Sequence, residues 1–520
     1  MNRSSERRWV ILGVLVLSSL LVTIDNTIVN VALPTMGREL DAGITDLQWV
    51  VDAYTLVFAG LLLVGGNLGD RLGRKRILIL GLALFAVTSL AGSLAQDTGQ
   101  LIAARAAMGA AAALVFPATL AILIQVFTVP RERAMAIGIW AATAGVAVAL
   151  GPVTGGFLLE HYSWGSVFVV GVPIAVIAAV AGWFLVPDSR DPSPGRFDGL
   201  GALLSIGSIG LLVYALIEAP RHGWASPATV VGLAAALSAL TAFVVWESRR
   251  TDPLLEVRLF RNARFSAASA AIALAFFGLF GFIFLVTQYF QVVQGYGTLE
   301  AGLRTLPFAV VMGALSPVAV LAVRLLGTKL VVAGGLLLMS AGFAVAATVS
   351  SASQYWGAVV VSMVLMAAGL ALIASPATEA IMGALPPAKA GAGSAVNDTS
   401  REVGGTLGVA VLGSVMVSVY GDQVVGALRS LGLPTGFVEA AQDSVVAGYQ
   451  GISALPAAVQ PAATAAVRDA FLAGLSAASW VAVGATAVAA IGALLFLPAR
   501  GAGEQSRTAH PAESDVVVGA

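Results

Sequence analysis

The chain contains no cysteine, only three histidines and few charged residues. The absence of cysteine excludes disulfides, thiol catalysis and thiolate metal sites. The histidines, His161, His222 and His510, lie far apart in the sequence, so we expect neither a histidine metal centre nor a cofactor bound through one. Charged residues make up 11% of the 520 residues, whereas soluble proteins carry about 25%. The composition therefore excludes an ordinary soluble domain.

Long apolar runs take the place of the missing charges. The chain is 58% hydrophobic, and its 58 glycines suit helices that pack closely inside lipid. A run of about 20 apolar residues is long enough to cross a bilayer as a helix. We therefore expect an all-α integral membrane protein with fourteen transmembrane helices. The predicted spans lie near residues 9–33, 48–68, 76–95, 101–126, 134–158, 166–186, 199–219, 227–247, 266–291, 303–323, 330–349, 356–384, 398–420 and 475–497.

The distribution of basic residues supports this count. If the N-terminus is cytoplasmic and the spans alternate, 22 of the 28 Lys and Arg residues fall in cytoplasmic segments and five fall outside. The remaining one, Arg105, lies within a span. Because Lys and Arg favour the cytoplasmic side, this asymmetry indicates a multi-pass protein of the cell membrane with both termini cytoplasmic.

Two pairs of segments repeat with the same offset in span number. Phe116–Ile122 in span 4 recurs as Ser375–Ile381 in span 12, each copy with Pro-Ala-Thr at its centre. The turn after span 2 has a weaker counterpart after span 10. The residues of this second pair are Arg71, Gly73 and Lys75 in the first turn, and Arg324, Gly327 and Lys329 in the second. Parallel repeats around a central path are typical of transporters.

The repeats predict the domain organisation. Residues 1–186 are expected to form one six-helix half, and residues 187–265 two inserted helices with a cytoplasmic linker. Residues 266–500 are expected to form the second six-helix half, in which residues 421–474 form a long external loop with short amphipathic helices at the membrane interface. Residues 501–520 are expected to be a disordered cytoplasmic tail.

Two charged residues lie inside predicted spans. Asp25 is roughly 12 Å from the outer end of span 1, and Arg105 roughly 6–9 Å from the outer end of span 4, so the two side chains can meet. A charge within a span costs about 2.5–3.5 kcal/mol and marks a polar pathway. We expect Asp25 and Arg105 to couple protons to transport. The alternatives are a structural ion pair joining spans 1 and 4, or extension of the Arg105 side chain to the outer interface. Asp52, one turn from the outer end of span 2, is either a second proton-coupling acid or an interfacial residue.

Two glycine-containing segments stand out in the first half of the chain. The short turn after span 2 is glycine-broken and strongly basic, so it is expected to lie in water on the cytoplasmic side; its residues are Gly66, Asp70, Arg71, Gly73, Arg74, Lys75 and Arg76. Glycine and proline also interrupt span 5. They indicate either a bend between the two halves or close helix packing, and the residues are Gly145, Gly151, Pro152, Gly155 and Gly156. Asp398, Arg401 and Glu402 are expected to begin span 13 at its cytoplasmic end. The carboxylate of Glu402 suits the positive helix N-terminus, which favours a capping and gating role over proton transfer.

Aromatic and amide side chains from spans 1, 2, 5 and 9 are candidates for a substrate cavity. Aromatic walls with few polar groups suit lipophilic and cationic ligands. Each aromatic residue taken singly is more often part of the core, so the prediction rests on the group. Its members are Asn26, Asn30, Tyr54, Phe58, Trp140, Phe284, Gln288 and Gln291.

Several of these segments resemble one known family. Asp25–Pro34 is similar to the span-1 signature of the fourteen-helix drug:proton antiporters of the major facilitator superfamily, and Gln48–Leu56 is similar to their span-2 opening. Gly66–Arg76 resembles the superfamily loop signature. Further resemblances are Arg105 with Gly109 to the span-4 motif linked to proton transfer, Gly151-Pro152 with Gly155-Gly156 to the antiporter motif, and Asn397–Gly405 to the start of span 13.

The resemblance implies two six-helix halves with two extra central helices, and a carrier rather than an enzyme. It implies that the turn from Gly66 to Arg76 is a cytoplasmic gate, in which Asp70 and Arg74 latch the cytoplasmic side. It also implies that Asp25 and Arg105 couple proton entry to substrate exit. The turn around Arg324 departs from the pattern because no acid there matches Asp70, so its latch is weakened. The partners implied are a small-molecule substrate, protons and lipid, with no nucleic acid, for a monomeric protein.

The function expected is proton-coupled export of lipophilic compounds, including cationic and antibiotic-like ones. Export of one endogenous metabolite, lipid or amino acid is an open alternative, because a lipophilic cavity serves both. A proton-translocating subunit of a membrane complex is a remote alternative. Such subunits use intramembrane lysines, whereas the three lysines here, Lys75, Lys329 and Lys389, lie in loops or at helix ends.

Overall fold

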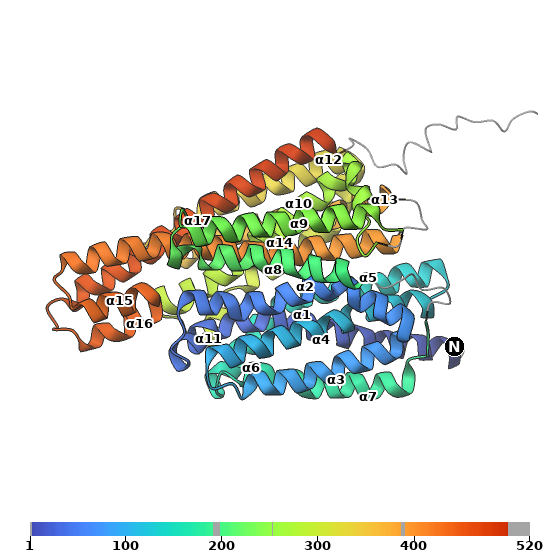
Figure 1. Cartoon of the computed structure of the whole chain (residues 1–520), viewed down its shortest axis with the longest axis horizontal. Helices are drawn as coiled ribbons and strands as arrows, with labels where there is room; N and C mark the ends of the chain where they lie inside the picture. The colour runs from blue at the N-terminus through green and yellow to red at the C-terminus, as the bar shows by residue number, and fades with distance from the viewer. Residues whose placement is uncertain (1–2, 191–197, 252, 386–389, 498–520) are drawn as a thin grey trace, which may run out of the picture.

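The computed structural model describes residues 3–190, 198–251, 253–385 and 390–497, and within these ranges every regular element is a helix (Figure 1). The predicted tail at 501–520 and Lys389 lie outside the described residues. The first seven helices are α1 (Arg3–Glu39), α2 (Ile44–Leu72), α3 (Arg74–Ser93), α4 (Thr98–Val126), α5 (Pro130–His161), α6 (Ser166–Val169) and α7 (Gly171–Leu185). They are followed by α8 (Gly199–His222), α9 (Pro227–Arg249) and the 3₁₀ turn η1 (Val257–Arg261).

The rest of the chain forms a second set of long helices. These are α10 (Ala263–Gln288), continued by the π-helical turn η2 (Tyr289–Val293), then α11 (Thr298–Leu303), α12 (Leu306–Ala346), η3 (Tyr355–Val359), α13 (Val360–Gly383), α14 (Ala390–Ser430), α15 (Thr435–Asp443), α16 (Val445–Gly451), η5 (Ile452–Ala454) and α17 (Gln460–Phe496).

The described residues contain fourteen membrane crossings. Thirteen helical segments are long and apolar enough to cross, and one of them, Thr298–Ala346, has 49 residues. At 1.5 Å per residue this segment is over twice the roughly 30 Å of the hydrocarbon core. Gly327 interrupts it with φ 81°, a backbone conformation that favours glycine, so the chain crosses twice. Gly73, its predicted counterpart between α2 and α3, has φ 110°.

Two layers of helices lie side by side in Figure 1. The blue and cyan helices α1–α7 form one layer, and α10, α12, α13, α14 and α17 belong to the other. α8 packs on α2 and α14, so it bridges the two layers, and α9 packs on α8. We call the end of the molecule that carries the Gly66–Arg76 turn and the start of α1 the basic end, and the opposite end the far end. Large apolar side chains such as Phe184 and Trp183 cover the outside, as expected of a multi-pass membrane protein.

Small residues allow the helices of the first layer to approach closely. A Cβ at Gly65 would collide with the backbone of Ala113, and one at Gly109 would collide with the backbone of Tyr54. These two positions fix the crossing of α2 and α4, because only glycine lets the backbones come this near. The crossing in turn places Arg105, one turn before Gly109, against α1 and α2.

The segment predicted as a long external loop has a different structure from the one expected. α14 continues to Ser430 and α17 begins at Gln460, and with α15 and α16 they form a helical extension that projects from the far end (Figure 1). The extension has its own buried core, and the Tyr420 hydroxyl donates a 2.5 Å hydrogen bond to the Ala441 carbonyl. The apolar faces of these helices pack against one another, and their expected position at the membrane interface stays a prediction. Buried members of the core are Val424, Leu428, Val438, Val467 and Phe471.

The start of span 13 was also predicted wrongly. α14 begins at Ala390, so Glu402 lies about three turns inside the helix and cannot cap its N-terminus. Within the described residues, one carboxylate oxygen of Glu402 is buried without a hydrogen-bond partner. The helix extends towards the basic end through a run of small residues before Asp398. Hydrophobicity did not reveal this extension, because the run is only weakly hydrophobic.

Candidate functional site

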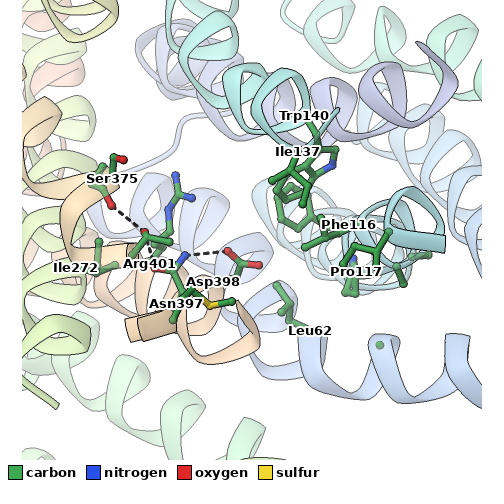
Figure 2. A pocket seen from close by; sticks show the side chains of 18 of the residues that line it. Leu62, Phe116, Pro117, Ile137, Trp140, Ile272, Ser375, Asn397, Asp398 and Arg401 are labelled. Carbon is green, nitrogen blue, oxygen red and sulfur yellow. Dashed lines mark hydrogen bonds between the residues drawn. The ribbon is translucent and has the colours of Figure 1, made fainter. Parts of the chain in front are cut away.

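A cavity of about 1980 Å³ lies between the two layers and extends to the basic end. Its walls are formed by α2, α4 and α5 on one side and by α10, α12, α13 and α14 on the other, and Thr251, Pro253, Leu254 and Glu256 also line it. Figure 2 shows Phe116, Pro117 and Trp140 facing Ser375, Asp398 and Arg401 across the open space. A concave, largely apolar space with a few polar groups is the usual form of a small-molecule site.

Hydrogen bonds between the layers close the far end. The amide of Gln291 donates to the carbonyl of Val31 at 2.7 Å. The hydroxyl of Thr298 donates to the carbonyl of Gly156 at 3.1 Å. Gln48 of α2 reaches the carbonyl of Val409 on α14 at 3.2 Å. The molecule is therefore open at the basic end and closed at the far end.

Asp25 and Arg105 form a buried ion pair outside the large cavity. The Nη1 of Arg105 contacts the Oδ2 of Asp25 at 2.5 Å, and their side chains are 0% and 6% exposed. The Nε of Arg105 donates to the carbonyl of Val50 at 3.0 Å, and its guanidinium lies 4.3 Å from the ring centre of Tyr54. The sequence predicted that these two charges can meet, and the structure brings them together. One arginine thus joins α1, α2 and α4.

Asp25 also borders a small crevice between α1 and the α6–α7 segment. The crevice has a volume of about 40 Å³ and is otherwise lined by apolar side chains such as Leu21, Ile24 and Ile174. One water molecule needs about 10–15 Å³. The carboxylate therefore has room for a water beside it, although it does not border the large cavity.

Asp52 is fully buried, so the interfacial alternative for this residue is wrong. Neither oxygen of its carboxylate has a hydrogen-bond partner among the described residues. It lies one helical turn from Gln48 on the same face of α2, the face that packs on α14. The second layer covers α2 at this position. The distance of Asp52 from the end of the helix does not reveal this tertiary contact.

The basic turn holds an ion pair within one layer. Arg74 contacts Asp70 at 2.7 Å, and its Nη1 reaches the carbonyl of Ala121 on α4. Gly73 takes the positive φ that this turn requires, and the N–H of Arg74 donates to the carbonyl of Ser189 at 2.8 Å. In the part of the chain that the structure describes, no bond joins Asp70 or Arg74 to the second layer. The latch therefore stays a prediction for a state closed at the basic end.

The glycines of α5 take part in two different contacts. A Cβ at Gly151 would collide with Thr27, and one at Gly155 would come within 2.8 Å of Ile28, so these two pack α5 on α1 of the same layer. At Gly156 a Cβ would lie 2.6 Å from the backbone of Leu299 in the second layer. The same interface brings Pro152 against Gly302 of α11. Gly151 and Gly155 thus serve helix packing within one layer, and Pro152 and Gly156 lie at the contact between the layers, whereas the bend between the two halves stays a prediction.

Most of the predicted cavity residues lie elsewhere. Of the eight, Trp140 lines the cavity. The other seven are buried or half-buried, and none of them lines this cavity. They are Asn26, Asn30, Tyr54, Phe58, Phe284, Gln288 and Gln291. Gln291 lies at the contact between the layers, Tyr54 packs beside Arg105 within the first layer, and Phe58 packs on Phe116 with ring centres 5.9 Å apart.

Sequence reasoning missed other lining residues. Phe116 packs on Trp140 with ring centres 5.1 Å apart, and the Nε1 of Trp140 donates to the Thr119 hydroxyl at 3.0 Å. Across the cavity stand Ser375 and Glu379. The internal repeat was the available signal, because its two copies line the opposing walls.

Comparisons with known proteins agree with this arrangement. A family model described as Major Facilitator Superfamily matches residues 15–409. The multidrug efflux pump LfrA of Mycolicibacterium smegmatis is 37% identical over 464 residues, covering 89% of this chain and 90% of that protein. The tetracenomycin C resistance and export protein of Streptomyces glaucescens is 34% identical, covering 94% of this chain and 91% of that protein.

A solved structure shares the fold. A bacterial homologue of the human lysosomal transporter Spinster, solved in an inward-facing and unoccupied conformation, has a TM-score of 0.63 at 18% identity, covering 95% of this chain and 98% of that one. The matched family model, the full-length relatives and the fourteen crossings show that the chain belongs to the Major Facilitator Superfamily, in its fourteen-helix drug:proton antiporter family.

Proposed function

We propose that this protein is a proton-coupled exporter of lipophilic compounds, including cationic and antibiotic-like ones, across the cytoplasmic membrane. The observation that carries the proposal is the separation of two sites within one molecule. A cavity large enough for a drug-sized molecule extends to the basic end, and an intramembrane ion pair lies outside it. An antiporter needs both a substrate site and a proton site, and needs them to act on the same helices.

Asp25 is the proposed proton carrier and Arg105 its partner. When the carboxylate of Asp25 is charged, it accepts a charge-assisted hydrogen bond from Arg105. A proton on Asp25 removes that charge and weakens the link between α1 and α4. Because α1 also carries the Val31 carbonyl that Gln291 binds, a shift of α1 alters the closure at the far end. Asp52, buried without a partner on α2, is a second proposed proton site.

The orientation and organisation are also proposals. The excess of Lys and Arg at the basic end supports a cytoplasmic location for that end and for both termini. The cavity then faces the cytoplasm, where an exporter collects its substrate. We propose that residues 1–186 and 266–500 act as the two halves, with 187–265 inserted between them, and that the protein works as a monomer. The superfamily consists of carriers in general, and we propose no enzymatic step.

Relatives support a drug-like substrate. The two described above are named for multidrug efflux and for export of tetracenomycin C. A relative in Salmonella typhimurium, 34% identical over 475 residues, is named for resistance to methyl viologen, a compound that carries positive charge. The cavity has an aromatic wall beside charged groups, which suits such compounds. Export of one endogenous metabolite is the alternative.

The test is substrate-driven proton movement in everted membrane vesicles. A pH-sensitive probe follows the gradient while a panel of lipophilic cations and natural antibiotics is added. The native protein is expected to dissipate the gradient with some compounds, and Asp25→Asn is expected not to. Asp97→Asn is the matched control, because Asp97 is an exposed helix cap at the far end and Asn caps as well as Asp. If no compound acts on a folded and inserted native protein, broad drug export is refuted.

A further inference from the structure

The internal repeat gives the cavity two chemically different walls. The copy in α4 contributes Phe116, Pro117 and Leu120, and the copy in α13 contributes Ser375 and Glu379. Leu120 and Glu379 occupy the same position of the repeat, as do Phe116 and Ser375. Figure 2 shows Phe116 and Trp140 on one side of the space and Ser375 on the other. The repeated backbone therefore presents an aromatic wall to a polar, acidic one.

The charges that line the cavity are largely engaged by neighbours. Arg74 is held by Asp70 at 2.7 Å. Arg133 donates to the carbonyl of Phe127 at 2.8 Å. Arg401 lies over the ring of Phe276, 4.5 Å from its centre.

The acidic residues that line the cavity differ in whether a neighbouring group engages them. Asp398 accepts a hydrogen bond from Asn397 at 3.3 Å and shares its helix with Arg401 one turn on. Glu256 has a partner of its own. Glu379 is exposed, and within the described residues it has neither an ionic nor a hydrogen-bond partner. It is therefore the acid in this cavity that is left for an incoming cation.

We propose that Glu379 is the residue that recognises the charge of cationic substrates, and that an amphipathic monocation binds with its charged end at Glu379 and its aromatic body against Phe116 and Trp140. This inference rests on the proposed export function and names the substrate class of that site. The aromatic rings of Phe116 and Trp140, 5.1 Å apart, supply the surface for the apolar body. Neutral compounds use that wall alone, so the charge of Glu379 separates two classes of ligand that share one cavity.

The test compares two probes of similar shape in the full-length purified protein. Tetraphenylphosphonium carries a positive charge, and triphenylphosphine oxide presents similar aryl groups without one. Equilibrium binding of both is measured for the native protein, for Glu379→Gln and for the charge-retaining Glu379→Asp. We expect Glu379→Gln to weaken tetraphenylphosphonium binding about tenfold or more, a difference of about 1.4 kcal/mol. Triphenylphosphine oxide binding is expected to change less than about twofold, and Glu379→Asp to retain most of the cation affinity.

Each other outcome has a separate meaning. If Glu379→Gln binds both probes as the native protein does, Glu379 does not read charge and the inference is overturned, while export itself stands. Equal loss of both probes also overturns it, because the side chain would then shape the cavity rather than recognise charge. Unchanged binding of the neutral probe reports that the variant is folded. If the native protein binds neither probe and moves no protons with any compound of the panel, the proposed function itself fails.

Discussion

The close approach of α5 and α11 at Gly156 gives the sharpest prediction about how the far end opens. In Gly156→Ala the new Cβ would lie 2.6 Å from the Cα of Leu299 and from the carbonyl oxygen of Thr298. Both are backbone atoms, so no side-chain rotation relieves the contact. The backbones must separate by about 1 Å to restore ordinary van der Waals distances. Because the contact exists where the layers close, the strain falls on the closed state.

The expected size of the effect follows from overpacking. Adding a methyl group to a tightly packed contact costs about 1–3 kcal/mol. A shift of that size changes the ratio of closed to open states about 5- to 150-fold. Replacing glycine within a helix also favours the helix by about 1 kcal/mol, an effect unrelated to the interface. Gly138→Ala is the matched control, because it lies on the same helix and a Cβ there meets nothing within 4 Å.

The assay uses the absence of cysteine from the chain. A single cysteine in place of Val31, which is fully buried at the far end, reports opening through its rate of reaction with a membrane-impermeant maleimide. We expect Gly156→Ala to raise this rate at least several-fold over the native background, and Gly138→Ala to leave it unchanged. Equal rates in the two glycine variants would show that the contact does not hold the far end closed.

Three further predictions concern single side chains. Tyr420→Phe should lower the free energy of unfolding of the far-end extension by about 1 kcal/mol, because the Tyr420 hydroxyl is hydrogen-bonded. Tyr449→Phe should not lower it, because the Tyr449 hydroxyl is buried without a partner in the part of the chain described. Thermal unfolding of the two variants distinguishes these outcomes. Burial raises the pKa of the Tyr449 hydroxyl to about 12, whereas the same group titrates near 10 in an unfolded chain. The folded extension should therefore lose stability as pH rises from about 10 through 12, and a spectroscopic alkaline titration of Tyr449→Phe should lack that phase. Arg105→Lys should reduce proton-coupled transport at least about tenfold, although the positive charge is kept. One ammonium group cannot replace a guanidinium that contacts Asp25 and the Val50 carbonyl together. Native transport rates for this variant in the vesicle assay would refute this reasoning.

The number and order of the crossings could be predicted from the sequence because lipid imposes a simple condition. Every backbone polar group in the hydrocarbon must be satisfied within its own helix, so a span appears as a long apolar run. This rule also separated the two crossings within α12, which are joined through Gly327. It did not predict the helix ends at the far end, where α14 continues to Ser430 and α17 begins at Gln460, both outside the predicted spans. Helices that bury against one another in water carry mixed composition, and their ends cannot be read from hydrophobicity.

The candidate site was predictable only where a residue broke the apolar rule. Asp25 and Arg105 were visible as charges inside spans, and the structure brings them together. Glu379 lies inside the repeated segment, yet its place on a cavity wall depends on how α4 and α13 face each other. The predicted aromatic wall was largely misplaced for the same reason, since an aromatic ring suits lipid, core and cavity equally well.

By itself the sequence determined the class of the protein, its fourteen crossings, the repeat and the intramembrane charges, because these follow from local composition and from the cost of charge in lipid. Only the tertiary structure decided which helices meet. It buried Asp52 against the second layer, assigned Gly151 and Gly156 to different partners, and placed Phe116 and Glu379 on opposite walls of one cavity. These contacts join residues up to several hundred positions apart, and their geometry arises from the packing of whole helices, which local sequence does not encode.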